Sequence, residues 1–430
     1  MTTSPGTEIF DFAARVYPLA RSLTGAGVDQ TLALVAERLP LEVRSVPSGT
    51  PVFDWTVPPV WTVHEAWLAD PSGRRIVDVA DHPLHLLGYS SPMRGTFGLD
   101  ELRPHLFSLP ATPDAIPFRT SYYAANWGFC LRDELLASLE EGEYEVCIDT
   151  SFDDGGALRY GEVLLPGASA REVLVTTHVC HPAMANDNAT GIAVATQLAE
   201  RLLARDRQLS YRFLFIPGTI GSITWLATNR DAWDRIAHGL VLTGLGDASP
   251  LTYKRSRRGD TTVDRAVLQA LTDAGAEHRV RDFSPYGYDE RQFCSPGVNL
   301  PVGRFGRGQH GEYPEYHTSK DDLDFISAEF LDESYRVLVD VLDILEQDRT
   351  YLSRNPFAEP QLGKRGLYRT LGFGLDRKAV EMSLLWVMNL ADGEHTLLDI
   401  AARSGLPFRA IVEAATALHA AELLDDRTLR

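Results

Sequence analysis

The sequence predicts an α/β fold built on a mostly parallel sheet with helices on both faces. Between residues 161 and 347, apolar runs of strand length alternate with segments whose apolar residues recur at helical spacing. This alternation is typical of parallel sheets covered on both sides. A stretch rich in turn residues comes before it and a helix–turn–helix pattern follows it, so the 430 residues are expected to form more than one domain.

The N-terminal third of the chain divides into two parts. Residues 8–39 predict two amphipathic helices, separated by a turn at 24–27. Residues 51–148 change to short strand-like pieces broken by Pro and Gly, which predicts an inserted β-rich domain. Residues 1–50 and 149–350 are then expected to form one discontinuous α/β domain around this insertion.

The alternating region predicts a series of strands and helices in chain order. Strands are expected at 173–177, 211–216, 239–245 and 298–302, and helices at 188–203, 222–229, 262–274 and 327–347. Ligands of such sheets bind beyond the carboxyl ends of the strands. The loops that follow residues 177, 216 and 245 are therefore expected to converge on one site.

The C-terminal residues 351–430 predict a small winged-helix-like domain. A linker with Pro and Gly covers 355–374, a helix covers 381–390, and a helix–turn–helix pattern begins at 396. Between residues 381 and 426 there are two basic and eight acidic residues. Reading DNA needs basic flanks around a recognition helix, so a structural or protein-contact role is predicted instead.

Composition limits the compartment and the partners. The net charge of −18 argues against nucleic-acid binding, which depends on Lys and Arg replacing counterions. The four cysteines form no CxxC pair, and neither a signal peptide nor a membrane span is recognisable, so a cytoplasmic protein without a membrane partner is predicted. Homo-oligomerisation is left open.

Four residues with metal-binding side chains fall at predicted strand ends or in the loop before the last long helix: His178, Asp187, Asp247 and His317. Each one alone has an ordinary structural explanation, such as a hydrogen-bonded histidine, a helix N-cap or a turn. Hydrolytic zinc needs neutral imidazoles, carboxylates and an open position. The joint placement of the four residues favours a shared metal site.

Longer strings resemble a known bacterial family. They are THVCHPAMANDNATG, IPGTIGS, DERQFCSPGVNLPVG and GEYPEYHTSKDDLDFIS, together with the N-terminal RSLTGAG, VPSGTPVFDWTVP and SYYAANWGFC. The sequence is similar to a family with a zinc aminopeptidase-like domain, an inserted β-rich domain and a C-terminal winged helix. Its members are often linked to polysaccharide or natural-product biosynthesis.

The resemblance implies a phosphorylase/hydrolase-like fold and a site for one or two zinc ions. Matched by order, Asp187 would bridge the ions, with His178 and Asp247 on the first and His317 on the second. The aminopeptidases also carry a ligand glutamate and a neighbouring general base after the second strand. This sequence has Gly218 there, and loss of a general base typically lowers the rate by ~10²–10⁴-fold. The aspartate that orients the first histidine in those enzymes is replaced by Cys180.

Other residues are candidates for the missing role and for substrate binding. Glu312 is the first choice for the base, and His181 is a second catalytic candidate that could serve as a metal ligand or as a base. For every candidate, a local hydrogen bond or ion pair is an equally good explanation. The predicted substrate-binding residues are Asp289, Glu290, Arg291, Tyr313 and Tyr316.

The predicted function is that of a zinc-dependent hydrolase or amide-processing enzyme. Its substrate would be a small aminoacyl or peptide-like metabolite, used in natural-product or polysaccharide biosynthesis. The alternative is a peptidase-like scaffold or binding protein that has lost peptidase activity, which the missing carboxylate at position 218 and the acidic C-terminal domain favour.

Overall fold

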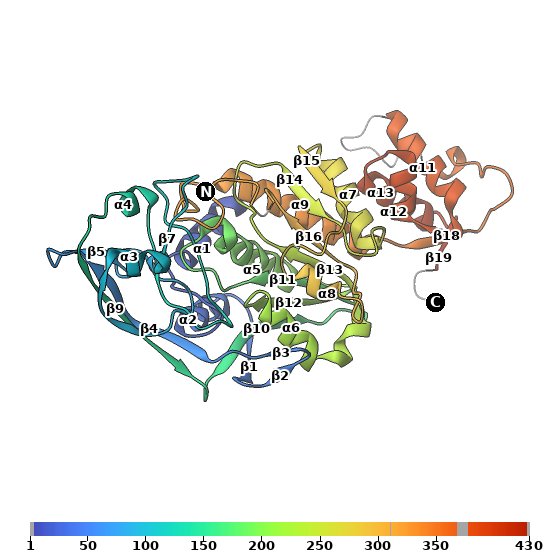
Figure 1. Ribbon diagram of the computed structural model, residues 1–430. Coiled ribbons are helices and arrows are strands. Elements are labelled where there is room, and N and C mark those ends of the chain that lie inside the picture. Colours follow the sequence, from blue (N-terminus) through green and yellow to red (C-terminus); the bar gives the residue numbers. More distant parts are fainter. Residues whose placement is uncertain (1–3, 310, 368–376, 428–430) are drawn as a thin grey trace. The chain divides into compact units, whose positions relative to one another are not determined.

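The computed structural model describes residues 4–309, 311–367 and 377–427 (Figure 1). The chain forms two compact units, Met1–Gly259 with Arg279–Tyr335, and Asp260–His278 with Arg336–Arg430. The inserted region predicted at 51–148 belongs to the first of these units. The domain boundaries expected from the sequence therefore stay predictions. Within the linker predicted at 355–374, residues 368–374 lie outside the described part of the chain.

An eight-stranded sheet forms the framework of the first unit. Its four central strands, β12, β11, β13 and β16, are parallel to one another, whereas β1, β10 and β14 pair antiparallel on either side of them. The expected α/β fold with a parallel centre is confirmed. In sheet order the strands are β1 (Glu42–Pro47), β10 (Ala157–Leu165), β12 (Ser210–Ile216), β11 (Glu172–His178), β13 (Ile236–Leu242), β16 (Val302–Gly306), β14 (Leu251–Lys254) and β15 (His278–Arg281).

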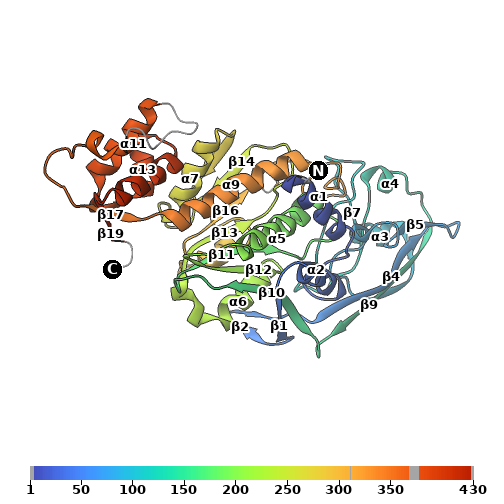
Figure 2. The same cartoon turned by 180° about the vertical axis from the view of Figure 1, so that it is seen from behind.

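Helices cover both faces of this sheet, as the two opposed views show (Figures 1 and 2). On one face lies α5 (Thr190–Leu203), which packs on β11 and β12 and is itself covered by α1 (Pro5–Val16). On the other face, α6 (Ile220–Thr228) packs its apolar side chains against β11, β12 and β13. α2 (Ala26–Ala36) packs on β10, and α8 (Glu290–Phe293) on β16.

One predicted strand lies four residues later than expected. The apolar letters of 298–302 favoured a strand there, but Asn299 has a φ of +49°, a left-handed conformation that ends regular extension. The strand β16 instead contains two glycines and a buried arginine. Gly303 is required because a Cβ at this position would lie 2.2 Å from the Tyr253 hydroxyl of the neighbouring strand. Close contact between strands, which a hydropathy pattern does not reveal, decides this boundary.

A buried ion network crosses three adjacent strands of the sheet. Arg212 on β12 is 6% exposed and lies between two carboxylates that are less than 5% exposed, Glu162 on β10 and Glu172 on β11. Its Nε donates to the Glu172 carboxylate at 2.6 Å, and the same carboxylate accepts a second hydrogen bond from Arg235 Nε at 2.8 Å. The indole of Trp225 donates to Glu162 at 3.3 Å. Removing the central guanidinium would leave two buried carboxylates without their main partner.

We expect Arg212→Ala to lower the free energy of unfolding by about 3–5 kcal/mol, the usual cost of breaking a buried pair from one side. Urea unfolding followed by circular dichroism measures it. The matched control is Arg44→Ala, because Arg44 pairs with the same Glu162 at 3.2 Å but is 47% exposed. That variant should lose less than about 1 kcal/mol. Equal losses in the two variants would contradict the argument from burial.

The inserted region has a sheet and a core of its own. Its four strands run in the order β5, β4, β9, β6, and the core includes Leu68, Phe129, Tyr144 and Val146. The sequence predicted a β-rich insertion but not the bounds of its individual strands. The strands are β4 (Val60–Ala69), β5 (Arg75–Asp78), β6 (Met93–Gly98) and β9 (Glu143–Asp153); smaller elements are β2 (Pro51–Val52), β3 (Trp55–Thr56), β7 (Leu106–Phe107), β8 (Phe129–Cys130), α3 (Leu99–Leu102) and α4 (Asp133–Ala137).

The second unit combines α7 (Thr262–Ala274) with the C-terminal helices and a three-stranded sheet in the order β18, β17, β19. The helix–turn–helix begins where Thr396 caps α12 (Leu397–Ser404) through a capping box with Asp399, and Gly405 ends that helix in a left-handed conformation. The other elements are β17 (Thr350–Ser353), α11 (Arg377–Leu390), β18 (Asp392–Thr396), α13 (Phe408–Ala420) and β19 (Leu424–Asp426).

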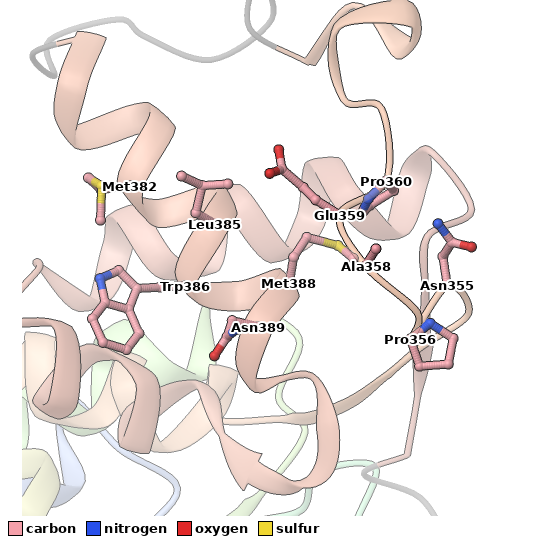
Figure 3. A pocket seen from close by; sticks show the side chains of 10 residues that line it. All are labelled: Asn355, Pro356, Ala358, Glu359, Pro360, Met382, Leu385, Trp386, Met388 and Asn389. Atoms are coloured by element: carbon pink, nitrogen blue, oxygen red, sulfur yellow. The ribbon is translucent and has the colours of Figure 1, made fainter.

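A hollow in this unit lies between the segment 355–360 and α11 (Figure 3). Its walls are largely apolar and include Met382, Trp386 and Met388. The long helix α9 (Ala328–Gln347) precedes the unit's C-terminal part in the chain. In the described part of the chain, no helix combines the length and the apolar character that crossing a membrane requires.

Candidate active site

The candidate site lies beyond the carboxyl ends of the central parallel strands, as predicted for this topology. β11 ends at His178, and the loop after it carries His181 and Asp187 before α5 begins. β12 is followed by Gly218, and the loop between β16 and α9 carries His317. The segment after β11 and the loop between β16 and α9 thus deliver side chains to one edge of the sheet, beside the glycine that follows β12.

Three of these side chains form a cluster that is suited to hold a metal ion. Ligand atoms of His178, His181 and Asp187 all lie within 4.8 Å of one another. His178 Nε2 is 2.8 Å from His181 Nδ1 and 3.0 Å from Asp187 Oδ1, and His181 Nδ1 is 3.6 Å from the same oxygen. Tetrahedral zinc with bonds of about 2.0–2.1 Å separates its ligand atoms by about 3.4 Å. The donor set and its spacing therefore fit zinc.

His317 reaches the other oxygen of the same carboxylate. Its Nε2 lies 3.1 Å from Asp187 Oδ2. The residue has a φ of +55°, a left-handed conformation that is unfavourable for a histidine and that tends to occur at functional sites. The backbone of His317 is held by the inserted region, since its carbonyl accepts a hydrogen bond from the amide of Phe118 at 2.7 Å.

The electrostatics of the cluster favour the protonation states that a metal requires. Burial opposes ionisation of Asp187, but the charge of His181 and hydrogen bonds from the three histidines outweigh it and hold the pKa of Asp187 well below its usual value. Burial lowers the pKa of His181 and that of His317, which favours neutral rings. A charged carboxylate among neutral imidazoles is the donor chemistry of hydrolytic zinc sites.

A second layer of polar groups fixes the loop that carries Asp187. The carboxylate of Asp321 accepts the backbone amides of Asn186 at 2.6 Å and of Asp187 at 2.9 Å. Both oxygens of Asp247 are likewise engaged, by the Asn186 side chain and by the amide of Ser249, each at 2.6 Å. This placement argues against Asp247 as a metal ligand and gives it a supporting role instead.

Tyr288 completes the surroundings of Asp187. Its hydroxyl donates to Asp187 Oδ2 at 2.5 Å and lies 3.2 Å from the hydroxyl of Tyr316, while its ring stacks on His178 at 4.5 Å. Tyr316 stacks on His317 at 3.9 Å, so it lies beside the cluster, and its role in substrate binding stays a prediction. Burial, followed by the nearby charge of Asp187, raises the pKa of Tyr288 well above its usual value, so its hydroxyl remains a proton donor.

A carboxylate lies beside the position where the sequence lacks one. A Cβ built on Gly218 would be 3.2 Å from Asp289 Oδ2 and 3.2 Å from His178 Cβ. Asp289 is fully buried, its Oδ1 accepts a hydrogen bond from the Ser222 hydroxyl at 2.6 Å, and its Oδ2 has no hydrogen-bond partner in the described residues. The absence of a side chain at Gly218 thus makes room for a carboxylate from another segment.

The other predicted residues lie in different surroundings. Glu312 is 2.7 Å from the guanidinium of Arg281 and 43% exposed, which argues against the base role expected for it. Glu290 is buried and pairs with Lys254 at 2.5 Å, so it holds the loop that carries Tyr288 and Asp289. Arg291 is exposed, and Tyr313 packs against Phe325 and Tyr316.

A family model described as a domain of unknown function, DUF4910, matches residues 10–348, and a winged helix-turn-helix model matches residues 349–426. A protein of Clostridium acetobutylicum is 45% identical over 98% of this chain and 97% of its own length. The chain belongs to the DUF4910 family. The Clostridium relative is named as a candidate polysaccharide biosynthesis protein with an aminopeptidase-like domain.

Solved structures support the same fold for this DUF4910 protein. The crystal structure of a candidate peptidase from Clostridium acetobutylicum matches with a TM-score of 0.92 at 44% identity, covering 98% of this chain and 96% of that one. A zinc aminopeptidase from Bacillus subtilis matches with a TM-score of 0.59 at 15% identity, over 79% and 94% of the two chains. The α/β part of the DUF4910 protein therefore has the aminopeptidase fold.

Pattern reasoning passed over two residues that lie close in sequence to predicted ones. Asp321 follows the predicted ligand His317 by four residues, and Tyr288 immediately precedes the predicted residue Asp289. Their proximity along the chain to predicted residues was the available signal. A backbone-capping carboxylate and a tyrosine hydroxyl are recognised only when the loops are placed in three dimensions.

In the DUF4910 protein, the buried carboxyl of Asp289 is expected to make stability depend on pH. Burial raises its pKa to about 7 from an ordinary value of 3.8. Because the folded state binds the proton more tightly, stability falls as the pH rises through the range between these two values. We expect Asp289→Asn to be more stable than the wild type at pH 8, by up to about 4 kcal/mol, and to match it near pH 4. Urea unfolding of chelator-treated protein at the two pH values measures this, and a pH-independent difference would contradict it.

Proposed function

We propose that this DUF4910 protein is a zinc-dependent hydrolase or amide-processing enzyme acting on a small aminoacyl or peptide-like metabolite. The observation that carries the proposal is the cluster of His178, His181 and Asp187, whose ligand atoms lie within 4.8 Å of one another at the carboxyl ends of the parallel strands. Single metal ligands are common by chance, but three buried donors on an aminopeptidase fold point to one zinc ion. His317 would be a further ligand through its position beside Asp187 Oδ2.

The chain's own groups account for the remaining steps of amide hydrolysis. Bound zinc would polarise a carbonyl group and activate water. Asp289 Oδ2, for which the described part of the chain offers no hydrogen-bond partner, would accept the proton of the attacking water and return it to the leaving nitrogen. Ser222 holds the other oxygen of that carboxylate, and the Tyr288 hydroxyl, which donates to Asp187, would keep that metal-ligand carboxylate in place.

Metal analysis of chelator-free protein, combined with an activity screen, tests the proposal. We expect about one equivalent of zinc, and hydrolysis of aminoacyl p-nitroanilides that is lost on chelation and restored by zinc. Zinc below about a tenth of an equivalent, together with unchanged stability on chelator addition, would overturn it.

A second candidate rests on Gly218, which carries no carboxylate where aminopeptidases use one. In this alternative the protein is a scaffold or binding partner in a biosynthetic pathway, and the acidic winged helix docks another protein. Gly218→Glu separates the two candidates. Activity gained only in this variant favours a scaffold, whereas activity already present in the wild type and lost in Asp289→Asn favours the enzyme.

The biosynthetic setting and the location are part of the same proposal. The name of the Clostridium relative supports a place in polysaccharide biosynthesis. A cytoplasmic enzyme with a small-molecule substrate and without a nucleic-acid or membrane partner agrees with the net charge of −18.

A further inference from the structure

A buried arginine close to the candidate metal site has two nitrogen atoms without partners. Arg21 is 2% exposed, and its Nη1 donates to the carbonyl of Val16. Its Nε and Nη2 are buried and have no hydrogen-bond partner among the residues that the structure describes. Burial lowers its pKa only to about 10, so the guanidinium is charged at neutral pH. The charge of Asp321 acts on it, but no carboxylate of the described residues is paired with it. A buried charge without a paired counter-ion is costly, which indicates that a ligand supplies one.

The two unpaired atoms lie on the same edge of the guanidinium, which binds carboxylates in a bidentate manner. The chain itself contains two examples of this geometry. Arg212 uses Nε and Nη2 to bind the two oxygens of Glu172, and Arg38 uses the same pair to bind Glu200. The free edge of Arg21 is therefore a carboxylate-binding edge that no carboxylate of the described chain occupies.

Arg21 lines a cavity of about 240 Å³. Most of its walls are apolar, and they come largely from the inserted region, through Trp61, Leu84, Leu86 and Phe118. Its polar lining includes Ser22 and the exposed His64, and no aspartate or glutamate lines it. An apolar cavity with one unpaired cation fits an organic acid in which a carboxylate is attached to a short hydrocarbon or aromatic group.

The cavity and the metal cluster share a wall. The ring of Phe118 meets the rings of His181 and His317 edge-on, each at 5.2 Å between centroids. Pro182, which also lines the cavity, directly follows His181. The charge of Arg21 also acts on His181, where it favours the neutral ring. A substrate group held in the cavity would therefore lie next to the proposed zinc.

We propose that Arg21 and this cavity bind a carboxylate-bearing apolar portion of the substrate, so that the substrate class is an acidic aminoacyl or acylamino compound. The inference deepens the proposed function and rests on it, since the carboxylate end is held while the amide is presented to the metal cluster. It also gives the inserted region a role, which is to form the apolar wall of the substrate pocket.

Ligand binding tests the proposal without requiring turnover. The probe is 3-phenylpropionate, and the neutral control is 3-phenylpropionamide, each titrated calorimetrically into the zinc-loaded full-length protein. We expect the acid to bind at least about 10-fold more tightly than the amide, the usual effect of losing charge-assisted hydrogen bonds. Arg21→Gln should abolish this preference, and Arg21→Lys should keep only part of it because lysine lacks the bidentate edge.

The variant His178→Ala separates Arg21 from the metal, because carboxylates also bind zinc. Preference for the acid that persists in His178→Ala and disappears in Arg21→Gln supports the proposal. Loss in His178→Ala with retention in Arg21→Gln, equal binding of acid and amide, or no binding of either overturns it. If benzylphosphonate binds at this site and 3-phenylpropionate does not, the assignment of a carboxylate as the bound acidic group is wrong.

The unfolding temperature of Arg21→Gln distinguishes a ligand-binding arginine from a structural one, and zinc content with nitroanilide hydrolysis tests the hydrolase proposal separately. Arg21→Gln should unfold at or above the wild-type temperature, since it removes an uncompensated buried charge, whereas a purely structural arginine would give a lower temperature. The hydrolase proposal fails separately, through absence of zinc and of nitroanilide hydrolysis, and this leaves the binding comparison in the His178→Ala background unaffected.

Discussion

His178→Ala is expected to abolish zinc binding at the candidate site and all hydrolysis that depends on it. His178 Nε2 is the donor nearest to both other members of the cluster, at 2.8 Å from His181 Nδ1 and 3.0 Å from Asp187 Oδ1. Mutating a residue that only hydrogen-bonds to a metal ligand typically lowers metal affinity by ~10–100-fold. Loss of a direct ligand should therefore lower zinc affinity by more than about 100-fold. Zinc titration against a chromogenic chelator measures the change.

The matched control is His238→Ala. His238 is also a buried histidine of the same sheet, on β13, at 5% exposure, and burial lowers its pKa to about 3. It is not part of the metal cluster, so this variant should keep one equivalent of zinc even where its stability falls. If His238→Ala lost zinc as fully as His178→Ala, global unfolding rather than ligand loss would be the cause, and the site assignment would fail.

Asp289→Asn is expected to lower kcat by ~10²–10⁴-fold while zinc remains bound, because an amide cannot accept the proton that the carboxylate would take. The expectation rests on the buried, unpartnered Oδ2 beside Gly218 and on the pKa of about 7, which suits proton transfer near neutral pH. Zinc content and steady-state kinetics on the same preparations separate a lost base from a lost metal.

Two further variants sharpen this result. Glu312→Gln should leave kcat unchanged, since the Glu312 carboxylate is held by Arg281. Ser222→Ala removes the hydrogen bond that stabilises ionised Asp289, so the acidic limb of the pH–rate profile should move to higher pH. A rate loss in Glu312→Gln with none in Asp289→Asn would reverse the assignment and return the base role to Glu312.

Much of the fold was predictable because its signals are local. Apolar runs at 173–177 and 211–216 mark the central strands β11 and β12, and the helix expected at 262–274 coincides with α7. The antiparallel strands β10 and β14, which flank the parallel centre, were not predicted from the pattern. Strand β16 was misplaced because Gly303 and Arg304 are determined by neighbouring strands rather than by hydropathy.

By itself, the sequence determined the α/β class, the acidic winged helix and the positions of His178, Asp187 and His317 at or near strand ends. Strand ends can be read from a chain because periodicity is a property of neighbouring residues. Only the tertiary structure decided how the side chains are shared out: Asp247 supports a loop, His181 joins the metal cluster, and Asp289 lies beside Gly218. The positions of Asp247 and Asp289 depend on contacts with residues 61 and 71 positions away, Asn186 and Gly218. Whether a buried charge such as Arg21 finds a partner is likewise a property that no local pattern records.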